Sequence, residues 1–139
     1  MSKQPTLEQL EASFIQASTD ERMQFTAEVI SGDVPVLQVS IADREEFPVY
    51  ITLDDSQILC VTHLWKEGEI KPGCKEELLD ELMTMNLPMP LSAFSKIGTQ
   101  YVIFGALSAS AGIDEIIHEV EVLSENTLES FDGVAEYLK

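Results

Sequence analysis

The feature that most constrains this chain is a long segment almost without charge. Between Leu82 and Ile113 the only charged side chain is Lys96, in a protein with 25 acidic and 8 basic residues and a formal net charge of -17. Charged side chains are almost never buried unless they are paired, so a segment that lacks them is expected to lie against other atoms. We predict that this segment forms strands inside a sheet, with one face covered by helices and the other by another molecule.

The bulk composition predicts one folded domain with an acidic exterior. A chain of 139 residues is the usual size of one domain, and 45% hydrophobic residues are typical of a globular protein. The excess acid argues against nucleic acid and against anionic membrane surfaces as partners, because both attract cations. The natural complement is a protein with a basic surface.

The sequence also predicts a cytoplasmic protein without membrane insertion. Residues 1–14 lack the apolar region of a signal peptide. The longest uncharged run, residues 97–113, contains too many Gly, Ser, Thr and Gln residues for a membrane span. Cys60 and Cys74 make no metal-binding spacing with the two histidines, so we expect reduced thiols.

Hydrophobic periodicity divides the first half of the chain into a helix and four strands. Thr6 and Gln9 have the spacing of a capping box, which predicts a helix over 7–18. Alternating apolar residues then predict strands over 23–29, 34–41, 47–53 and 58–65. The second strand shifts its apolar phase once, which predicts a bulge, and Pro35 predicts an edge position. The fourth strand is almost continuously apolar, which predicts burial on both faces.

The second half of the chain reads as helix, hairpin, helix. A helix follows Pro72 and Gly73 and ends near Asn86, and its apolar stripe is Leu78, Leu79, Leu82, Met83 and Met85. Gly98 and Thr99 form the turn of the hairpin, and a last helix starts at Ile113 with a pattern that extends toward Leu138. The prediction is a single α+β domain over residues 1–139, an antiparallel sheet with helices packed on one face in the order α-ββββ-α-ββ-α.

No residue pattern predicts a catalytic, cofactor or metal site. His118 and Glu119 are half of a metalloprotease motif, but Val122 stands where the second histidine belongs. His63 is interpreted as a packed or edge histidine of a strand. Asp54 and Asp55 are interpreted as turn residues, because the chain runs straight into a strand after them.

The two cysteines differ in the chemistry that their positions predict. Cys60 lies in an apolar strand, where burial would keep the thiol protonated and inert. Cys74 lies near a helix start, where the dipole would stabilise a thiolate. A bystander role on the surface is the alternative for Cys74.

Two groups of residues are candidates for partner binding. The first is an apolar patch of Met85, Pro88, Met89 and Phe94, because methionine adapts its shape to different partners and loops often carry function. Filler of the core is the alternative for these residues. The second is the acidic last helix, where Glu119, Glu125 and Glu129 would attract a basic partner. A merely solvated face is the alternative there.

The blocks "MNLPMPLSAF" and "YVIFGALS", with "VYITLDDSQILCVTHLW", resemble the YjfI family of small bacterial cytoplasmic proteins. The genes of that family tend to lie beside one for a phage shock protein A-like protein, a coiled-coil effector of membrane stress, so the resemblance implies a role in envelope stress. The order of helices and strands is similar to that of the type III secretion chaperones and the YbjN proteins. Those chaperones are acidic homodimers, which implies a homodimer here.

The leading hypothesis is therefore a non-enzymatic acidic chaperone or adaptor that binds another cytoplasmic protein, without a cofactor. One alternative is an enzyme whose site cannot be read from the sequence. The other is an acidic mimic of nucleic acid, which blocks a DNA-binding protein.

Overall fold

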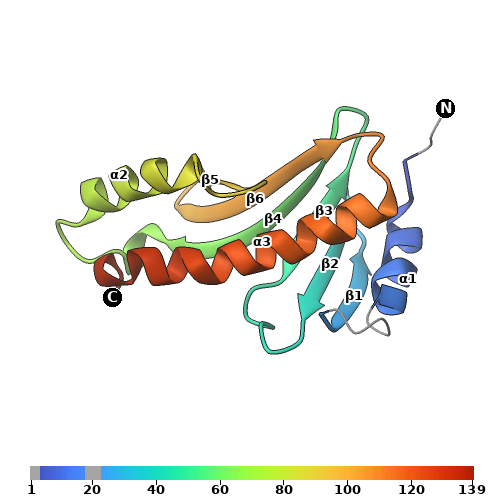
Figure 1. Ribbon diagram of the computed structural model, residues 1–139, viewed down its shortest axis with the longest axis horizontal. Helices are drawn as coiled ribbons and strands as arrows, with labels where there is room; N and C mark the ends of the chain where they lie inside the picture. The colour runs from blue at the N-terminus through green and yellow to red at the C-terminus, as the bar shows by residue number, and fades with distance from the viewer. Residues whose placement is uncertain (1–3, 18–22) are drawn as a thin grey trace.

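Six antiparallel strands form one sheet that three helices cover (Figure 1). The computed structural model describes residues 4–17 and 23–139. The helices are α1 (Leu7–Ala17), α2 (Lys75–Asn86) and α3 (Ile113–Val134). The strands are β1 (Phe25–Ile30), β2 (Val36–Ile41), β3 (Val49–Leu53), β4 (Gln57–Lys66), β5 (Ala93–Ile97) and β6 (Gln100–Ser108). The predicted fold class and order of elements are confirmed.

The strand order is β1-β2-β3-β4-β6-β5, so the meander of the first four strands is extended by the β5–β6 hairpin. The turn of that hairpin uses Gly98 at φ 61°, a conformation that favours glycine. The prediction that both hairpin strands lie inside the sheet was wrong for β5, because β5 is an edge strand. Its edge is partly capped, because the Phe94 N–H donates to Asn86 Oδ1 at 2.9 Å.

The bulge and the edge position predicted for the second strand were also wrong. β1 and β2 pair without interruption from Phe25 with Ile41 to Ile30 with Val36, and β2 lies between β1 and β3. Val34 and Pro35 belong to the connection before β2, which explains the shift in apolar phase. The irregular pairing of the sheet lies instead in β4, between His63 and Lys66.

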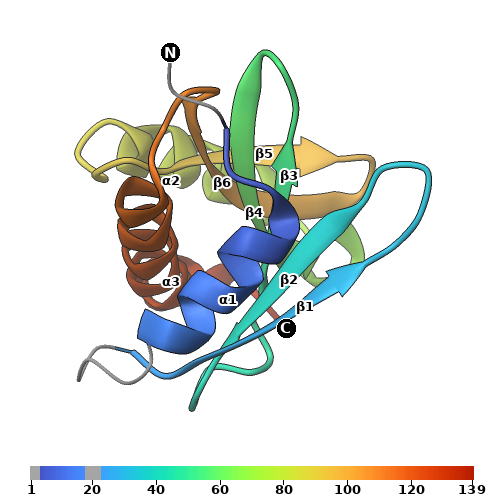
Figure 2. The same ribbon diagram turned by 90° about the vertical axis from the view of Figure 1, so that its right-hand side faces the viewer.

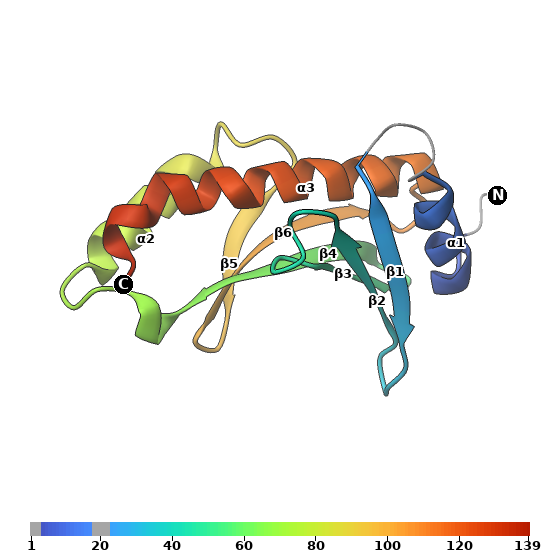
Figure 3. The ribbon, with the colours of Figure 1, turned by 90° about the horizontal axis from the view of Figure 1, so that it is seen from below.

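All three helices pack on the same face of the sheet (Figure 3). Figure 2 shows α1 across β1 and β2, while α3 runs along β4 and β6. Burial in β4 therefore alternates: Ile58, Cys60 and Thr62 are buried beneath the helices, whereas His63 on the other face is exposed. The expectation that β4 is buried on both faces was wrong, because none of the helices in residues 4–17 and 23–139 covers the outer face of the sheet.

The helix ends follow local signals. Thr6 and Gln9 form the predicted capping box, with hydrogen bonds of 2.9 and 3.1 Å between the side chain of each and the N–H of the other. The predicted end of this helix at Ser18 lies outside the described residues. α3 ends at Val134, earlier than its apolar pattern, and Leu138 instead forms an isolated bridge with Ile70.

The segment between Leu82 and Ile113 contributes to both core clusters, with Ile103 in the first and Tyr101 in the second. Trp65 and Tyr101 stack there with ring centroids 5.9 Å apart, beneath Leu78 and Leu82 of α2. The one charge of the segment is paired: Lys96 Nζ lies 3.2 Å from Glu67 Oε1 and 5.0 Å from the centroid of the Tyr101 ring. A charge beside a core cluster is tolerated when an ion pair and an aromatic face receive it.

Candidate functional site

A groove lies between α3 and the loop that follows α2. We call residues 87–92 the Met–Pro loop, and the space that it shares with α3 the Met–Pro groove. The groove has a volume of about 240 Å³, and its lining residues are Met85, Pro88, Met89, Pro90, Asn126, Glu129 and Ser130. Four of the seven residues predicted to bind a partner, namely Met85, Pro88, Met89 and Glu129, thus come together.

The Met–Pro loop is fixed to α3 by one side chain. Pro88 and Pro90 cannot continue α2, so the chain leaves the helix after Asn86. Asn126 Nδ2 donates to the carbonyl oxygen of Pro90 and to Ser92 Oγ, both at 2.9 Å. Asn126 and Ser92 are 4% and 7% exposed, so these hydrogen bonds form out of water and hold the loop firmly.

Two backbone features complete the groove. Leu91 adopts φ 63°, a left-handed conformation that costs energy for a residue with a side chain. Gly133 of α3 leaves room for Met85, because a Cβ at this position would lie 2.9 Å from Met85 Cε. The loop is therefore held in a strained shape, and a methionine fills the space left by a glycine.

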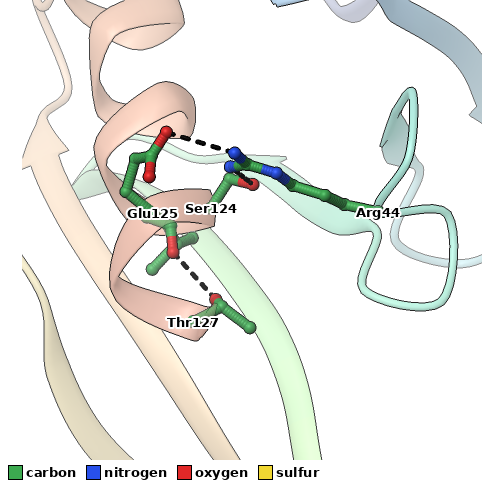
Figure 4. A network of polar contacts seen from close by, with 5 residues as sticks. Arg44, Ser124, Glu125 and Thr127 are labelled. Atoms are coloured by element: carbon green, nitrogen blue, oxygen red, sulfur yellow. Dashed lines mark hydrogen bonds and ion pairs between the residues drawn. The ribbon is translucent and has the colours of Figure 1, made fainter. Parts of the chain in front are cut away.

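The rim of the groove is acidic. Glu129 lines the groove and is exposed, and Asp132 on the next turn of α3 is exposed as well. Glu125 has a partner inside the molecule: its Oε1 accepts from Arg44 at 3.3 Å, and Arg44 also donates to Ser124 Oγ at 3.0 Å (Figure 4). Glu125 thus links the β2–β3 connection to α3, whereas Glu129 is exposed at the groove.

Phe94 lies outside the Met–Pro groove. It is half-buried on β5, packs against both core clusters and lines a second groove of about 360 Å³ between α2 and β5. The predicted apolar stripe of α2 is divided there. Leu78 and Leu82 are buried, whereas Leu79 and Met83 are 37% and 73% exposed.

The expectation that Glu119 lies on the solvated acidic face of α3 was wrong. Glu119 is 2% exposed, and its carboxyl group lies against Gly105 of β6. A Cβ at Gly105 would be 2.2 Å from Glu119 Oε2, so only glycine admits the carboxyl group there. Burial raises the pKa of Glu119, and the nearby charge of His118 lowers it by a smaller amount.

Of the side chains weighed for catalysis, Cys60 and His63 lie on opposite faces of β4, Asp54 precedes that strand and Cys74 precedes α2. Burial, with the charge of Glu119, raises the pKa of Cys60 to about 12, as expected for a protonated thiol in the core. Asp54 Oδ1 accepts hydrogen bonds from Ser56 and from the Gln57 N–H, so its predicted turn role is confirmed, and these bonds lower its pKa. The rings of His63 and Tyr50 pack at a tilt of 36°, with centroids 5.3 Å apart. The reactivity of Cys74, the N-cap residue of α2, stays a prediction.

Within residues 4–17 and 23–139, no three His, Cys, Asp or Glu side chains gather as metal ligands would. None of the helices in the described part of the chain is long and apolar enough to cross a membrane.

Sequence reasoning missed the polar residues that build the groove, above all Asn126, Ser92 and Ser130. Their signal lies in the periodicity of α3. Asn126 and Ser130 follow Leu123 at the intervals of the buried face, and both are buried. A short polar side chain at a core position of a helix indicates a hydrogen bond to another element.

Comparison with known proteins identifies the family. The chain belongs to the family described as uncharacterized proteins conserved in bacteria (DUF2170), which matches residues 4–138. This agrees with the predicted membership of a small bacterial family. No curated protein matches the chain significantly.

Solved structures share the fold at low sequence identity. YbjN from E. coli has a TM-score of 0.63 and 16% identity, with 100% of this chain and 99% of that chain covered. The Yersinia pestis type III secretion chaperone SycH, solved in complex with a fragment of YscM2, has a TM-score of 0.56 and 12% identity over 89% of this chain and 98% of that chain. A chain of the ExoU–SpcU complex from the type III secretion system of Pseudomonas aeruginosa has a TM-score of 0.54 and 9% identity, covering 88% and 95%. The predicted likeness in architecture is confirmed.

Replacing Asn126 by alanine should destabilise the protein by about 1–3 kcal/mol, because the Pro90 carbonyl and the Ser92 hydroxyl lose their buried donor. Urea unfolding followed by circular dichroism measures this change. Glu129→Gln is the control on the same helix, since an exposed acid without such bonds should change stability by less than about 0.5 kcal/mol. Equal effects of the two substitutions would contradict the role given to Asn126.

Proposed function

We propose that this protein is a non-enzymatic adaptor or chaperone of the cytoplasm that binds a segment of another protein in the Met–Pro groove. The observation that carries the proposal is the groove itself. Methionine and proline side chains form an apolar floor, Asn126 fixes the loop that bears them, and Glu129 stands at the rim. Methionine side chains change shape at little cost, so such a floor suits protein segments of varied sequence.

The charge of the protein defines the partner. Eight basic residues against 25 acidic ones leave a strong negative field, and the rim of the groove carries the same sign. A segment with apolar anchors between Lys or Arg residues matches both the floor and the rim. Charges at a rim mainly raise the association rate and make it sensitive to salt.

The similar structures support a binding role without defining it. SycH was solved with a fragment of YscM2, and the ExoU–SpcU structure is a heterodimeric complex. A fold of this kind is thus compatible with holding another protein. The hypotheses of an enzyme and of a nucleic-acid mimic gain no specific observation of their own.

The resemblance to the YjfI family suggests a particular partner. A phage shock protein A-like protein is the candidate that gene neighbourhood implies, and with it a role in envelope stress. If this is the partner, the purified pair should form a complex whose affinity falls with rising salt.

Reversal of one rim charge should separate binding in the groove from general attraction. Glu129→Lys should weaken the complex with the partner by about tenfold or more, because a cation would then face the partner's cations. Glu136→Lys, an equally large charge change at an exposed residue outside the groove, is the matched control and should have a much smaller effect.

Calorimetry or fluorescence anisotropy with both variants measures this difference. Equal losses in both would mean that net charge, not the groove, determines binding.

We also propose that the protein is a homodimer that associates through α2. Leu79 and Met83 of α2 and Leu87, the first residue after the helix, follow one another at intervals of four residues and are 37%, 73% and 94% exposed. An apolar stripe of this kind is rarely left in water.

Light scattering should give twice the mass of the chain, and Met83→Asp should halve the measured mass. A monomeric wild-type protein at micromolar concentration would rule out the dimer.

A further inference from the structure

Glu119 is the one buried acidic side chain among the described residues, and it faces the Met–Pro loop. It lies two turns before Asn126 on α3, so the two side chains share a face of the helix. A Cβ at Gly105 would lie 2.2 Å from Glu119 Oε2 and 3.2 Å from the carbonyl oxygen of Leu91. The carboxyl group of Glu119 and the carbonyl group of Leu91 therefore both approach Gly105 of β6.

Glu119 Oε2 has no hydrogen-bond partner, although it is buried. An ionised carboxylate is an acceptor only, and so is the Leu91 carbonyl, so no hydrogen bond can join the two groups while Glu119 is ionised. A protonated carboxyl group has an O–H that can donate to the carbonyl. The contact between Glu119 and the Leu91 carbonyl thus stabilises the observed position of the Met–Pro loop only when Glu119 carries a proton.

We propose that Glu119 is a proton-controlled latch on the Met–Pro loop. With a proton bound, its O–H donates to the Leu91 carbonyl and holds the loop against α3, so that the groove is formed. When the proton leaves, this hydrogen bond is lost, Leu91 relaxes from its left-handed conformation, and the groove loosens. The consequence for partner binding rests on the proposed function, whereas the latch itself does not.

The direction of the pH dependence follows from burial. The ordinary pKa of Glu119 is 4.5, and the pKa in the folded protein is higher because the charged form is desolvated. Folding therefore binds a proton, and the contribution of the latch is complete below pH 4.5 and is lost as the pH rises through the folded pKa. A partner should bind more tightly at mildly acidic than at alkaline pH.

The titratable groups around Glu119 are few. Cys60 faces it from β4, and with a pKa of about 12 that thiol keeps its proton throughout. His118 is its neighbour on α3 and is exposed. Gly105 of β6 and the Leu91 carbonyl of the loop do not titrate. His118 is thus the group that the experiment must distinguish from Glu119.

The test is an NMR titration of the protein alone, with ¹³C-labelled methionine methyl groups, from about pH 5 to 8.5. The Met89 methyl signal of the wild-type protein should shift in a single transition, whereas that of exposed Met83 should not. The carboxyl ¹³C signal of Glu119 should shift with the same midpoint. In Glu119→Gln, which is always neutral and can donate to the carbonyl, the Met89 signal should stay at its acidic position at every pH.

Two further variants complete the test. His118→Gln should keep the transition, and Gly105→Ala, which expels the carboxyl group, should abolish the transition of the Met89 signal. Different titration midpoints for Glu119 and Met89 in the wild-type protein would overturn the latch. An unchanged transition of the Met89 signal in Glu119→Gln would overturn it as well. This titration needs no partner. If the latch titrates as expected but the protein binds no partner, the latch stands and only the proposed function is refuted.

Discussion

The hydrogen bonds of Asn126 to the Met–Pro loop are the contact on which the functional surface depends. One buried amide donates to the Pro90 carbonyl and to Ser92 Oγ, at 2.9 Å each. Without the Asn126 amide, the loop, which contains two prolines and a left-handed Leu91, would lose the two hydrogen bonds that hold it against α3. Because the loop is fixed at that point, Met85, Pro88 and Met89 become the floor of a groove rather than a mobile connection.

The near absence of charge between Leu82 and Ile113 has two physical causes. Parts of the segment are core, since Tyr101 and Ile103 of β6 are buried beneath the helices. The Met–Pro loop is only partly covered, and its neutrality leaves an apolar surface in a protein of net charge -17. Glu129 lines this surface, Asp132 is exposed on the next turn of α3, and the carboxyl group of Glu119 is buried against Gly105.

Much of the fold could be predicted because it rests on local patterns. The Thr6–Gln9 capping box, the Gly98 turn and the alternation in the strands depend on residues close in sequence. Glu119 could not be placed in this way: it lies on the apolar face of α3, but only the missing side chain of Gly105, on a distant strand, makes room for its carboxyl group. The stripe of α2 was predicted too wide for the same reason, since the sheet covers Leu78 and Leu82 and leaves Met83 outside. The methionines and Glu129 of the groove were predicted, whereas Asn126 required the tertiary structure.

Photo-cross-linking from the methionines tests directly whether a partner protein binds in the Met–Pro groove. Replacement of the five methionines by a photoreactive analogue places probes in the groove, at Met85 and Met89, and outside it, at Met23 and the more exposed Met83. After irradiation in cells, mass spectrometry should find one partner peptide, with basic residues beside an apolar anchor, joined to Met85 or Met89. Partner adducts that are as frequent at Met23 as in the groove, or a groove that captures no protein, would contradict this claim, whereas adducts between Met83 and a second copy of the chain are expected from the proposed dimer.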